Sequence, residues 1–234
     1  MGGLTDWTYR QFWRNEEHPY RRLRRRLLAL AKPGMTILDA GCGHTAPNLQ
    51  ELRESGADLI GIDLVRLEPQ PGMELIEADL AKVPLADASV DLIYSRSVME
   101  HVVDPDGVYG ESARLLKPGG RWIFLTANRW DYVSLVSRMT PNRFHAAIVR
   151  RFEGRDEIDV FPTAYKTNDR GQIARHAAAH GFTIETFERH GQYPAMFYRV
   201  GPLFLLATLY EKLIMKIGFL APLRGWLYVE LVKR

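Results

Sequence analysis

MTILDAGCGHTA, at residues 35–46, joins a short apolar run to a glycine-rich end. The run predicts a buried strand over 35–41, because strands covered on both faces are continuously apolar. Gly41 and Gly43 follow, and the lack of a Cβ lets the backbone approach a ligand closely there. With Ala46 they partly match the G-x-G-x-x-G/A pattern of dinucleotide sites. The segment therefore predicts a strand, a ligand-binding loop and the start of a helix.

Strand-like and helix-like segments alternate outward from this loop. Further strands are expected at 57–64, 73–80, 89–97, 121–128, 182–190 and 226–234. Helices are expected at 19–31, 46–55, 105–116, 169–180 and 202–217, with the residues 117–120, KPGG, as a turn. This alternation predicts an α/β fold, with a mostly parallel sheet and helices on both faces.

Asp63 lies 20 residues beyond Gly43, at the end of the second expected strand. A carboxylate in this place accepts hydrogen bonds from ribose hydroxyls in nucleotide sites. The loop and Asp63 together predict a ligand that contains adenosine, and both NAD and S-adenosylmethionine (SAM) satisfy that requirement.

Four segments in one order resemble the class I SAM-dependent methyltransferases, in the branch similar to quinone-biosynthesis methyltransferases. They are LDAGCG from residue 38, GIDL from 61, EADLAKVPLADASVDLIYSRSVMEHV from 77 and LLKPGGRWIFLTAN from 115. The resemblance covers residues 35–128 well and 165–190 loosely. It implies a Rossmann-like, mostly parallel seven-stranded sheet with an antiparallel last strand, a methyl-transferring enzyme, and SAM as the cofactor.

The resemblance also implies roles for single residues. Asp39 would hold the SAM amino group and the loop, with Gly41 and Gly43 under the cofactor. Asp63 would take the ribose, with Leu64 beside it. The remaining expected cofactor residues follow later strands: Asp79 and Leu80 at the adenine, and Ser95 and Arg96 near the methionine end.

Three further residues are candidates for contact with the methyl acceptor. His101, just after the fourth expected strand, is a candidate general base, and a structural role is the favoured alternative. His145 and Tyr165 fall in a segment that caps the acceptor pocket in the resembling family, although core packing also explains a buried tyrosine. The sequence contains neither H-E-x-x-H nor Cys-x-x-Cys, so no metal is expected.

Composition fits a single domain of 234 residues with three additions. These are an N-terminal helical cap at 1–32, an acceptor-pocket insertion at 129–168 and an amphipathic helical insertion at 195–225. Cys42 is the one cysteine, so the chain cannot form an internal disulfide, and no signal peptide is visible. Both features are typical of a cytoplasmic protein, and no recognisable nucleic-acid module is present.

Charge is unevenly spread. Residues 33–127 carry 7 basic and 15 acidic side chains, whereas residues 1–32 carry 8 and 3. The acidic centre suits the cationic SAM better than the anionic NAD. In the expected helix at 202–217, Leu206, Leu209 and Leu213 share one face. We expect that face to be buried, either as a lid on the acceptor pocket or at the inner surface of a membrane.

The sequence therefore predicts a methyltransferase for a small, lipid-linked or glycan-linked acceptor, most simply at an oxygen atom. A SAM-binding protein without catalysis and, less favoured, an NAD-dependent oxidoreductase are the alternatives. The identity of the acceptor and the oligomeric state do not follow from the sequence.

Overall fold

The computed structural model describes residues 3–139 and 161–234. They group into two compact units. The sheet unit comprises residues 19–126, 164–188 and 227–234, and the helical unit comprises the described parts of 1–18, 127–163 and 189–226. Two of the expected additions, 1–32 and 129–168, are split between the units, because residues 19–32 and 164–168 belong to the sheet unit.

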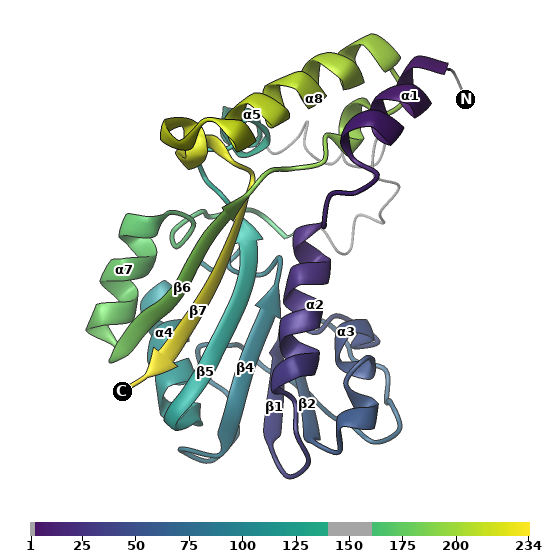
Figure 1. Cartoon of the computed structure of the whole chain (residues 1–234). Helices are drawn as coiled ribbons and strands as arrows, with labels where there is room; N and C mark the ends of the chain where they lie inside the picture. Colours follow the sequence, from purple (N-terminus) through teal and green to yellow (C-terminus); the bar gives the residue numbers. More distant parts are fainter. Residues whose placement is uncertain (1–2, 140–160) are drawn as a thin grey trace. The chain divides into compact units, whose positions relative to one another are not determined.

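A seven-stranded sheet forms the first unit, in the order β3-β2-β1-β4-β5-β7-β6. Its strands are β1 (Thr36–Ala40), β2 (Asp58–Asp63), β3 (Glu74–Glu77), β4 (Val90–Arg96), β5 (Leu116–Ala127), β6 (Phe182–His190) and β7 (Trp226–Lys233). The first five strands are parallel to one another, and β7 runs antiparallel between β5 and β6 (Figure 1). The predicted fold class is confirmed.

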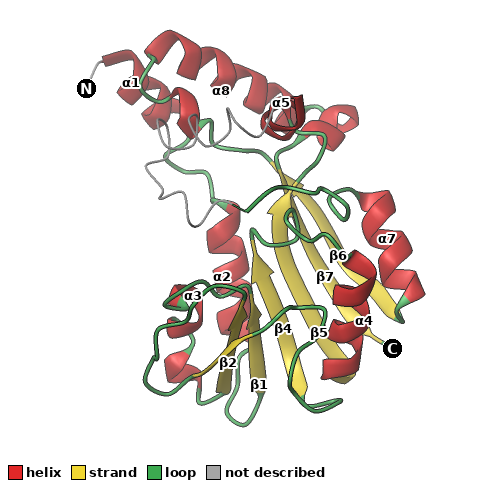
Figure 2. Cartoon of the chain, turned by 180° about the vertical axis from the view of Figure 1, so that it is seen from behind, coloured by secondary structure: helices red, strands yellow, loops and turns green. Residues whose placement is uncertain are grey.

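Helices cover both faces of this sheet. Helix α2 (Pro19–Leu30) lies on one face, and α4 (Pro105–Leu115) and α7 (Arg170–Ala179) lie on the other (Figure 2). The central strands are therefore largely buried, and Trp122 and Phe124 of β5 are almost fully buried. Trp122 meets Tyr109 of α4 with the ring centroids 4.7 Å apart, and this contact anchors α4 to the sheet.

Helix α2 is held by ion pairs as well as by its leucines. Arg26 donates to Glu230 of β7 at 2.8 Å, and Glu230 is 1% exposed. Arg22 donates to Glu188 of β6 at 3.0 Å. Such pairs gain strength from partial burial, where water screens them less. Two arginines of this helix are thus paired with glutamates of the same unit.

Two expected element boundaries were wrong. The helix expected at 46–55 is two short pieces, α3 (Pro47–Gln50) and the 3-10 helix η1 (Arg53–Ser55). The residues 117–120 do not form a free turn but lie inside β5, where the pairing with β4 shifts between Val90 and Leu92. Glycine at a strand irregularity is typical of a β-bulge, and this bulge keeps the chain on the sheet.

The helical unit contains α1 (Gly3–Phe12), α5 (Tyr132–Met139), the 3-10 helices η3 (Ala195–Phe197) and η4 (Gly218–Leu223), and α8 (Gly201–Lys216). No helix among the described residues is both long and apolar enough to cross a membrane. Arg224 closes the end of α8, because its guanidinium donates to the carbonyls of Ile214 at 3.0 Å and Met215 at 2.9 Å.

Helix α8 buries its polar side within the helical unit. Thr208 and Glu211 are fully buried, whereas Leu206, Leu209 and Leu213 are exposed. Hydrogen bonding explains this orientation. The indole N–H of Trp13 donates to Thr208 at 3.0 Å, and the peptide N–H of Gln192 donates to Glu211 at 2.9 Å. Buried donors require acceptors, so the polar side of α8 faces inward.

Two buried carboxyl groups give the helical unit a pH-dependent stability. Burial, helped by the charge of Asp131, raises the pKa of Glu211 to about 7 although the hydrogen bond from Gln192 lowers it. Burial also raises the pKa of Asp131 to about 6. An acid whose pKa is higher in the folded state favours folding fully below its unfolded pKa, near 4.5 for Glu211. That contribution is lost as the pH rises through about 7.

We therefore expect α8 to open more easily at about pH 8 than at about pH 5, and Glu211→Gln to remove most of the difference. The glutamine stays neutral and its oxygen still accepts from Gln192. Hydrogen exchange of peptides covering 201–216, corrected for intrinsic rates, measures the effect. Glu16→Gln is the control, because Glu16 is an exposed acid that pairs with Lys212 of the same helix. An equal pH response in wild type and Glu211→Gln contradicts the assignment.

Candidate cofactor site

The centre of the sheet contains a topological switch point. The chain leaves β1 for β2 on one side, whereas β4 continues to β5 on the other. Asp39 of β1 lies opposite Tyr94 of β4 in the parallel register. In open α/β sheets, ligands bind outside the carboxyl ends of the strands at such a point. The expected cofactor residues at 39–43 and 95–96 meet there.

The glycine loop follows β1 directly. Gly41 has φ +88° and Gly43 has φ +69°, values that other residues rarely adopt. A Cβ on Gly41 would collide with Val98, whereas a Cβ on Gly43 would meet nothing within 4 Å. Gly41 therefore permits close packing beneath the loop, and Gly43 leaves its backbone open on the other side.

Asp63 ties this loop to the end of β2. Its Oδ2 accepts a hydrogen bond from the peptide N–H of Gly43 at 2.7 Å, and its Oδ1 accepts from that of Leu64 at 2.7 Å. Sequence reasoning missed this structural role. A carboxylate has about four lone-pair sites, so it retains capacity for ribose hydroxyls. Leu64 is 64% exposed and places an apolar side chain beside the carboxylate.

Asp39 is a buried carboxyl group that is only half satisfied. The Tyr94 hydroxyl donates to its Oδ2 at 2.8 Å, and its Oδ1 has no hydrogen-bond partner among the described residues. Burial raises the pKa of Asp39 to about 7, while the hydrogen bond from Tyr94 lowers it. A cation placed at Oδ1 would stabilise the ionised form. The site therefore fits an ammonium group, as the amino end of SAM requires.

The adenine candidates lie after β3. Asp79 is exposed, and its Oδ1 accepts from the peptide N–H of Ala81 at 2.9 Å, which closes a tight turn. Leu80 is partly buried against the hydrophobic core. The turn thus presents one carboxylate outward and holds one leucine against the sheet.

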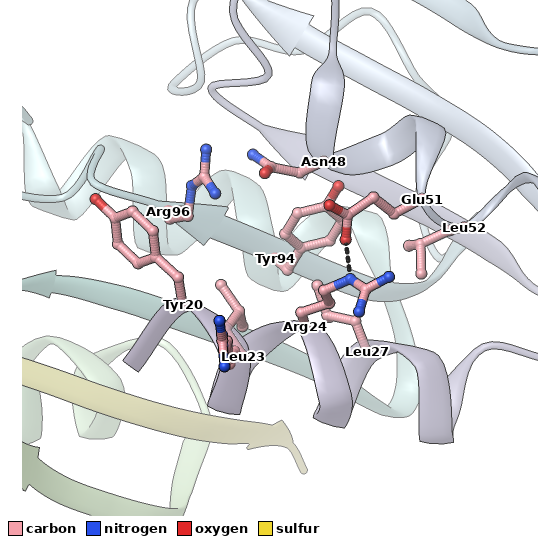
Figure 3. Close-up of a pocket in the computed structure, with 10 residues that line it drawn as sticks. Tyr20, Leu23, Arg24, Leu27, Asn48, Glu51, Leu52, Tyr94 and Arg96 are labelled. Atoms are coloured by element: carbon pink, nitrogen blue, oxygen red, sulfur yellow. Dashed lines mark hydrogen bonds and ion pairs between the residues drawn. The ribbon is translucent and has the colours of Figure 1, made fainter. Parts of the chain in front are cut away.

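Ser95 and Arg96 end β4 on opposite faces, because successive strand residues alternate. Arg96 lines a cavity together with Tyr94 and residues of α2 (Figure 3). Ser95 is 1% exposed, and its Oγ has no partner among the described residues. The side chains of Ser95 and Arg96 therefore lie on different faces of the sheet at the end of β4.

Of the three residues expected to contact the methyl acceptor, the structure describes two. His101 is half-buried in the turn after β4, where its peptide N–H donates to the Val98 carbonyl at 2.8 Å. Tyr165 is 7% exposed with φ +48°, in the sheet unit. His145 lies outside the described residues. Cys42 is buried, and burial raises the pKa of its thiol to about 12. A thiol with so high a pKa is a poor nucleophile.

A buried polar network that sequence reasoning missed holds the His101 turn. Thr126 donates to the Glu100 carboxylate at 2.6 Å, and Asn168 donates to the Thr126 hydroxyl at 2.7 Å. The Glu100 carbonyl also accepts from the peptide N–H groups of Ala164 and Tyr165. The sequence signal that could have indicated this network is the presence of polar residues at or just after the ends of apolar strands. Among the described residues, no three His, Cys, Asp or Glu side chains gather as metal ligands would.

Several curated relatives of this chain are named methyltransferases. A 24-methylenesterol C-methyltransferase from Oryza sativa is 28% identical over 67% of this chain and 44% of its own length. A probable S-adenosylmethionine-dependent methyltransferase from Mycolicibacterium smegmatis is 32% identical over 61% of this chain and 54% of its own. The chain thus spans about half or less of the length of these relatives.

Solved structures with low sequence identity share the fold. A geranyl diphosphate methyltransferase bound to geranyl diphosphate and sinefungin has a TM-score of 0.61 at 15% identity, covering 92% of this chain and 78% of its own. A SAM-dependent methyltransferase from Mesorhizobium loti has a TM-score of 0.58 at 22% identity, covering 89% and 95%. The cyclase SpnF has a TM-score of 0.59 at 17% identity, covering 95% and 85%.

The match to a family model settles the choice that the glycine loop and Asp63 left open. The model described as a methyltransferase domain covers residues 12–186, about three quarters of the chain. It includes β1 to β5, the glycine loop and the switch point. The chain therefore belongs to the methyltransferase domain family.

Proposed function

We propose that this enzyme methylates a small, lipid-like acceptor with SAM bound at the carboxyl ends of β1 and β4. The observation that carries the site is the Asp39 carboxyl group, buried beside the glycine loop with Oδ1 unpaired among the described residues. SAM supplies an electrophilic methyl group on a sulfonium sulfur, and methyl transfer is an in-line displacement that depends mainly on positioning.

Each cofactor residue has a proposed task. Asp39 binds the α-ammonium group, the backbone at Gly41 and Gly43 passes beneath the ligand, and Asp63 accepts from the ribose hydroxyls. Leu64, Asp79 and Leu80 surround the adenine, and Ser95 and Arg96 face the methionine end. Open space at Gly43 and the unpaired oxygens of Asp39 and Ser95 support these tasks.

The acceptor is proposed from the relatives. Several are named sterol or methylenesterol C-methyltransferases, and the geranyl diphosphate enzymes also act on a lipid-like molecule. Oxygen was the atom expected from the sequence, and these names make carbon the second candidate. Transfer of a 13C-labelled methyl group to a lipid extract distinguishes them, because the carbon chemical shift of an O-methyl differs from that of a C-methyl.

The first prediction concerns the ribose. Asp63→Asn should weaken binding of S-adenosylhomocysteine by about 10-fold or more, because a charged acceptor is worth roughly 1.5–3 kcal/mol. An analogue without ribose hydroxyls should lose far less. Isothermal titration calorimetry measures both ligands. Asp58→Asn, at the opposite end of the same strand, is the control and should bind as wild type. Equal losses for both ligands would place the ribose elsewhere.

The second prediction concerns proton removal, for which we propose His101. An acceptor that loses a proton on methylation needs a base within hydrogen-bond reach. His101→Ala should then lower turnover ~10²–10⁴-fold while SAM affinity stays near that of wild type. Tritiated SAM with a lipid extract provides the rate, and a thermal melt provides the folded fraction. Turnover that survives in a destabilised variant assigns His101 a structural role instead.

We also propose that the helical unit contacts a membrane surface through 195–225. Leu206, Leu209, Leu213 and Phe219 are exposed, and Phe219 is 82% exposed. Arg199 and Lys216 are exposed cations on the same segment. Lys212 and Arg224, which the sequence also suggested, instead bind Glu16 and the end of α8. Apolar side chains flanked by cations are typical of interfacial helices. The lid role of this segment stays a prediction.

Flotation with anionic liposomes tests this contact. Wild-type protein should float at low salt, and the pair Leu209→Glu with Leu213→Glu should remain at the bottom while melting normally. Val103→Glu is the control, because Val103 is 68% exposed in the sheet unit. It should float as wild type does. Wild-type protein that stays at the bottom removes the membrane proposal without touching the methyltransferase assignment.

A further inference from the structure

The sheet unit contains a cavity of about 130 Å3 between α2, the α3 region and the end of β4 (Figure 3). It is several times the volume of one water molecule, so it admits a small charged group but not a nucleoside. Helix α2 precedes the first strand, and only residue 96 in the cavity lining was expected at the cofactor site. The cavity therefore brings new residues next to that site.

Arg96 is a half-buried cation of this cavity that forms no ion pair with another lining residue, and Arg21, which also lines the cavity, is exposed. Arg24 is paired with Glu51, as the dashed line in Figure 3 marks. Arg96 has no ion pair or hydrogen bond to any described residue, and its guanidinium instead lies 4.5 Å from the centroid of the Tyr20 ring. A guanidinium has five N–H donors that match a carboxylate in two parallel hydrogen bonds. Arg96 is therefore a ready partner for a carboxylate.

Tyr20 fixes the position of this guanidinium in two ways. Its ring stacks against Arg96, and its hydroxyl is hydrogen-bonded to the Ser97 hydroxyl at 3.1 Å. Ser97 has φ +57°, an uncommon conformation that persists only when neighbouring contacts hold it. Its peptide N–H also donates to the Leu125 carbonyl at 2.8 Å. Tyr20 thus restrains the backbone directly after Arg96.

The charges on this face of the sheet match an amino acid. Asp39 pairs in register with Tyr94, and Arg96 lies two residues beyond Tyr94, so all three point to the same face. Asp39 has a free oxygen for an ammonium group, and Arg96 has free donors for a carboxylate. Two opposite charges on one face select a zwitterion rather than a simple cation.

We propose that Arg96 binds the α-carboxylate of SAM and that Tyr20 is the positioning residue that holds Arg96 for it. This inference rests on the proposed cofactor site. It makes α2, which lies ahead of the sheet in the chain, a part of that site. Selectivity for a ligand with an intact amino-acid end is the property that Tyr20 controls.

The test compares SAM with decarboxylated SAM, which lacks only the α-carboxylate. Dissociation constants come from isothermal titration calorimetry on wild type, Tyr20→Leu, Tyr20→Phe and Arg96→Gln. Tyr20→Leu should weaken SAM binding by about 10-fold and change decarboxylated SAM by less than about 2-fold. Tyr20→Phe keeps the ring and should lose less. Adding Arg96→Gln to Tyr20→Leu should cost little more than Arg96→Gln alone, since both act through one contact.

Leu28→Ala is the control, because Leu28 is an exposed residue of the same helix. It should bind both ligands as wild type does, and melts of all variants verify folding. A Tyr20→Leu variant that loses affinity for both ligands equally, or for neither, overturns the role of Tyr20. Wild-type protein that binds neither ligand overturns the cofactor site itself, and the two failures are thereby distinguished.

Discussion

The hydrogen bond from the Tyr94 hydroxyl to Asp39 joins β1 and β4 where the order of the sheet reverses. A carboxyl group removed from water needs partners for both oxygens, and this one has a partner for only one among the described residues. The glycine loop begins two residues later, and Asp63 holds that loop through Gly43. The site is therefore built with one unmet electrostatic requirement, which a cationic ligand satisfies.

The helical unit also buries polar groups. Thr208 accepts from Trp13, and one oxygen of Glu211 accepts from Gln192, while its Oε1 has no partner among the described residues. The cost is that three leucines of α8 are left outside. A helix whose polar side is needed inside must expose its apolar side, and an exposed apolar face marks a contact surface. The same orientation thus explains both the pH dependence expected of this unit and its proposed affinity for lipid.

Sequence patterns predicted the strands well, because buried parallel strands are short apolar runs with clear ends. They also placed Asp39 and Asp63 at strand ends. They failed where a tertiary contact reversed a local preference. The KPGG segment at 117–120 is a typical turn, yet it lies within β5. The side of α8 that packs within its own unit depends on Trp13, almost 200 residues away, which donates to Thr208. Tyr20 was not foreseen, because nothing local links an N-terminal helix to the end of β4.

The central claim is that SAM occupies the switch point with its amino-acid end between Asp39 and Arg96. A crystal structure of the protein with S-adenosylhomocysteine tests this most directly. The account predicts the α-ammonium group within hydrogen-bond distance of Asp39 Oδ1, the α-carboxylate on the Arg96 guanidinium, and the ribose hydroxyls on Asp63. Density for the ligand at any other strand end, or an amino-acid end that turns away from both charged side chains, would contradict it.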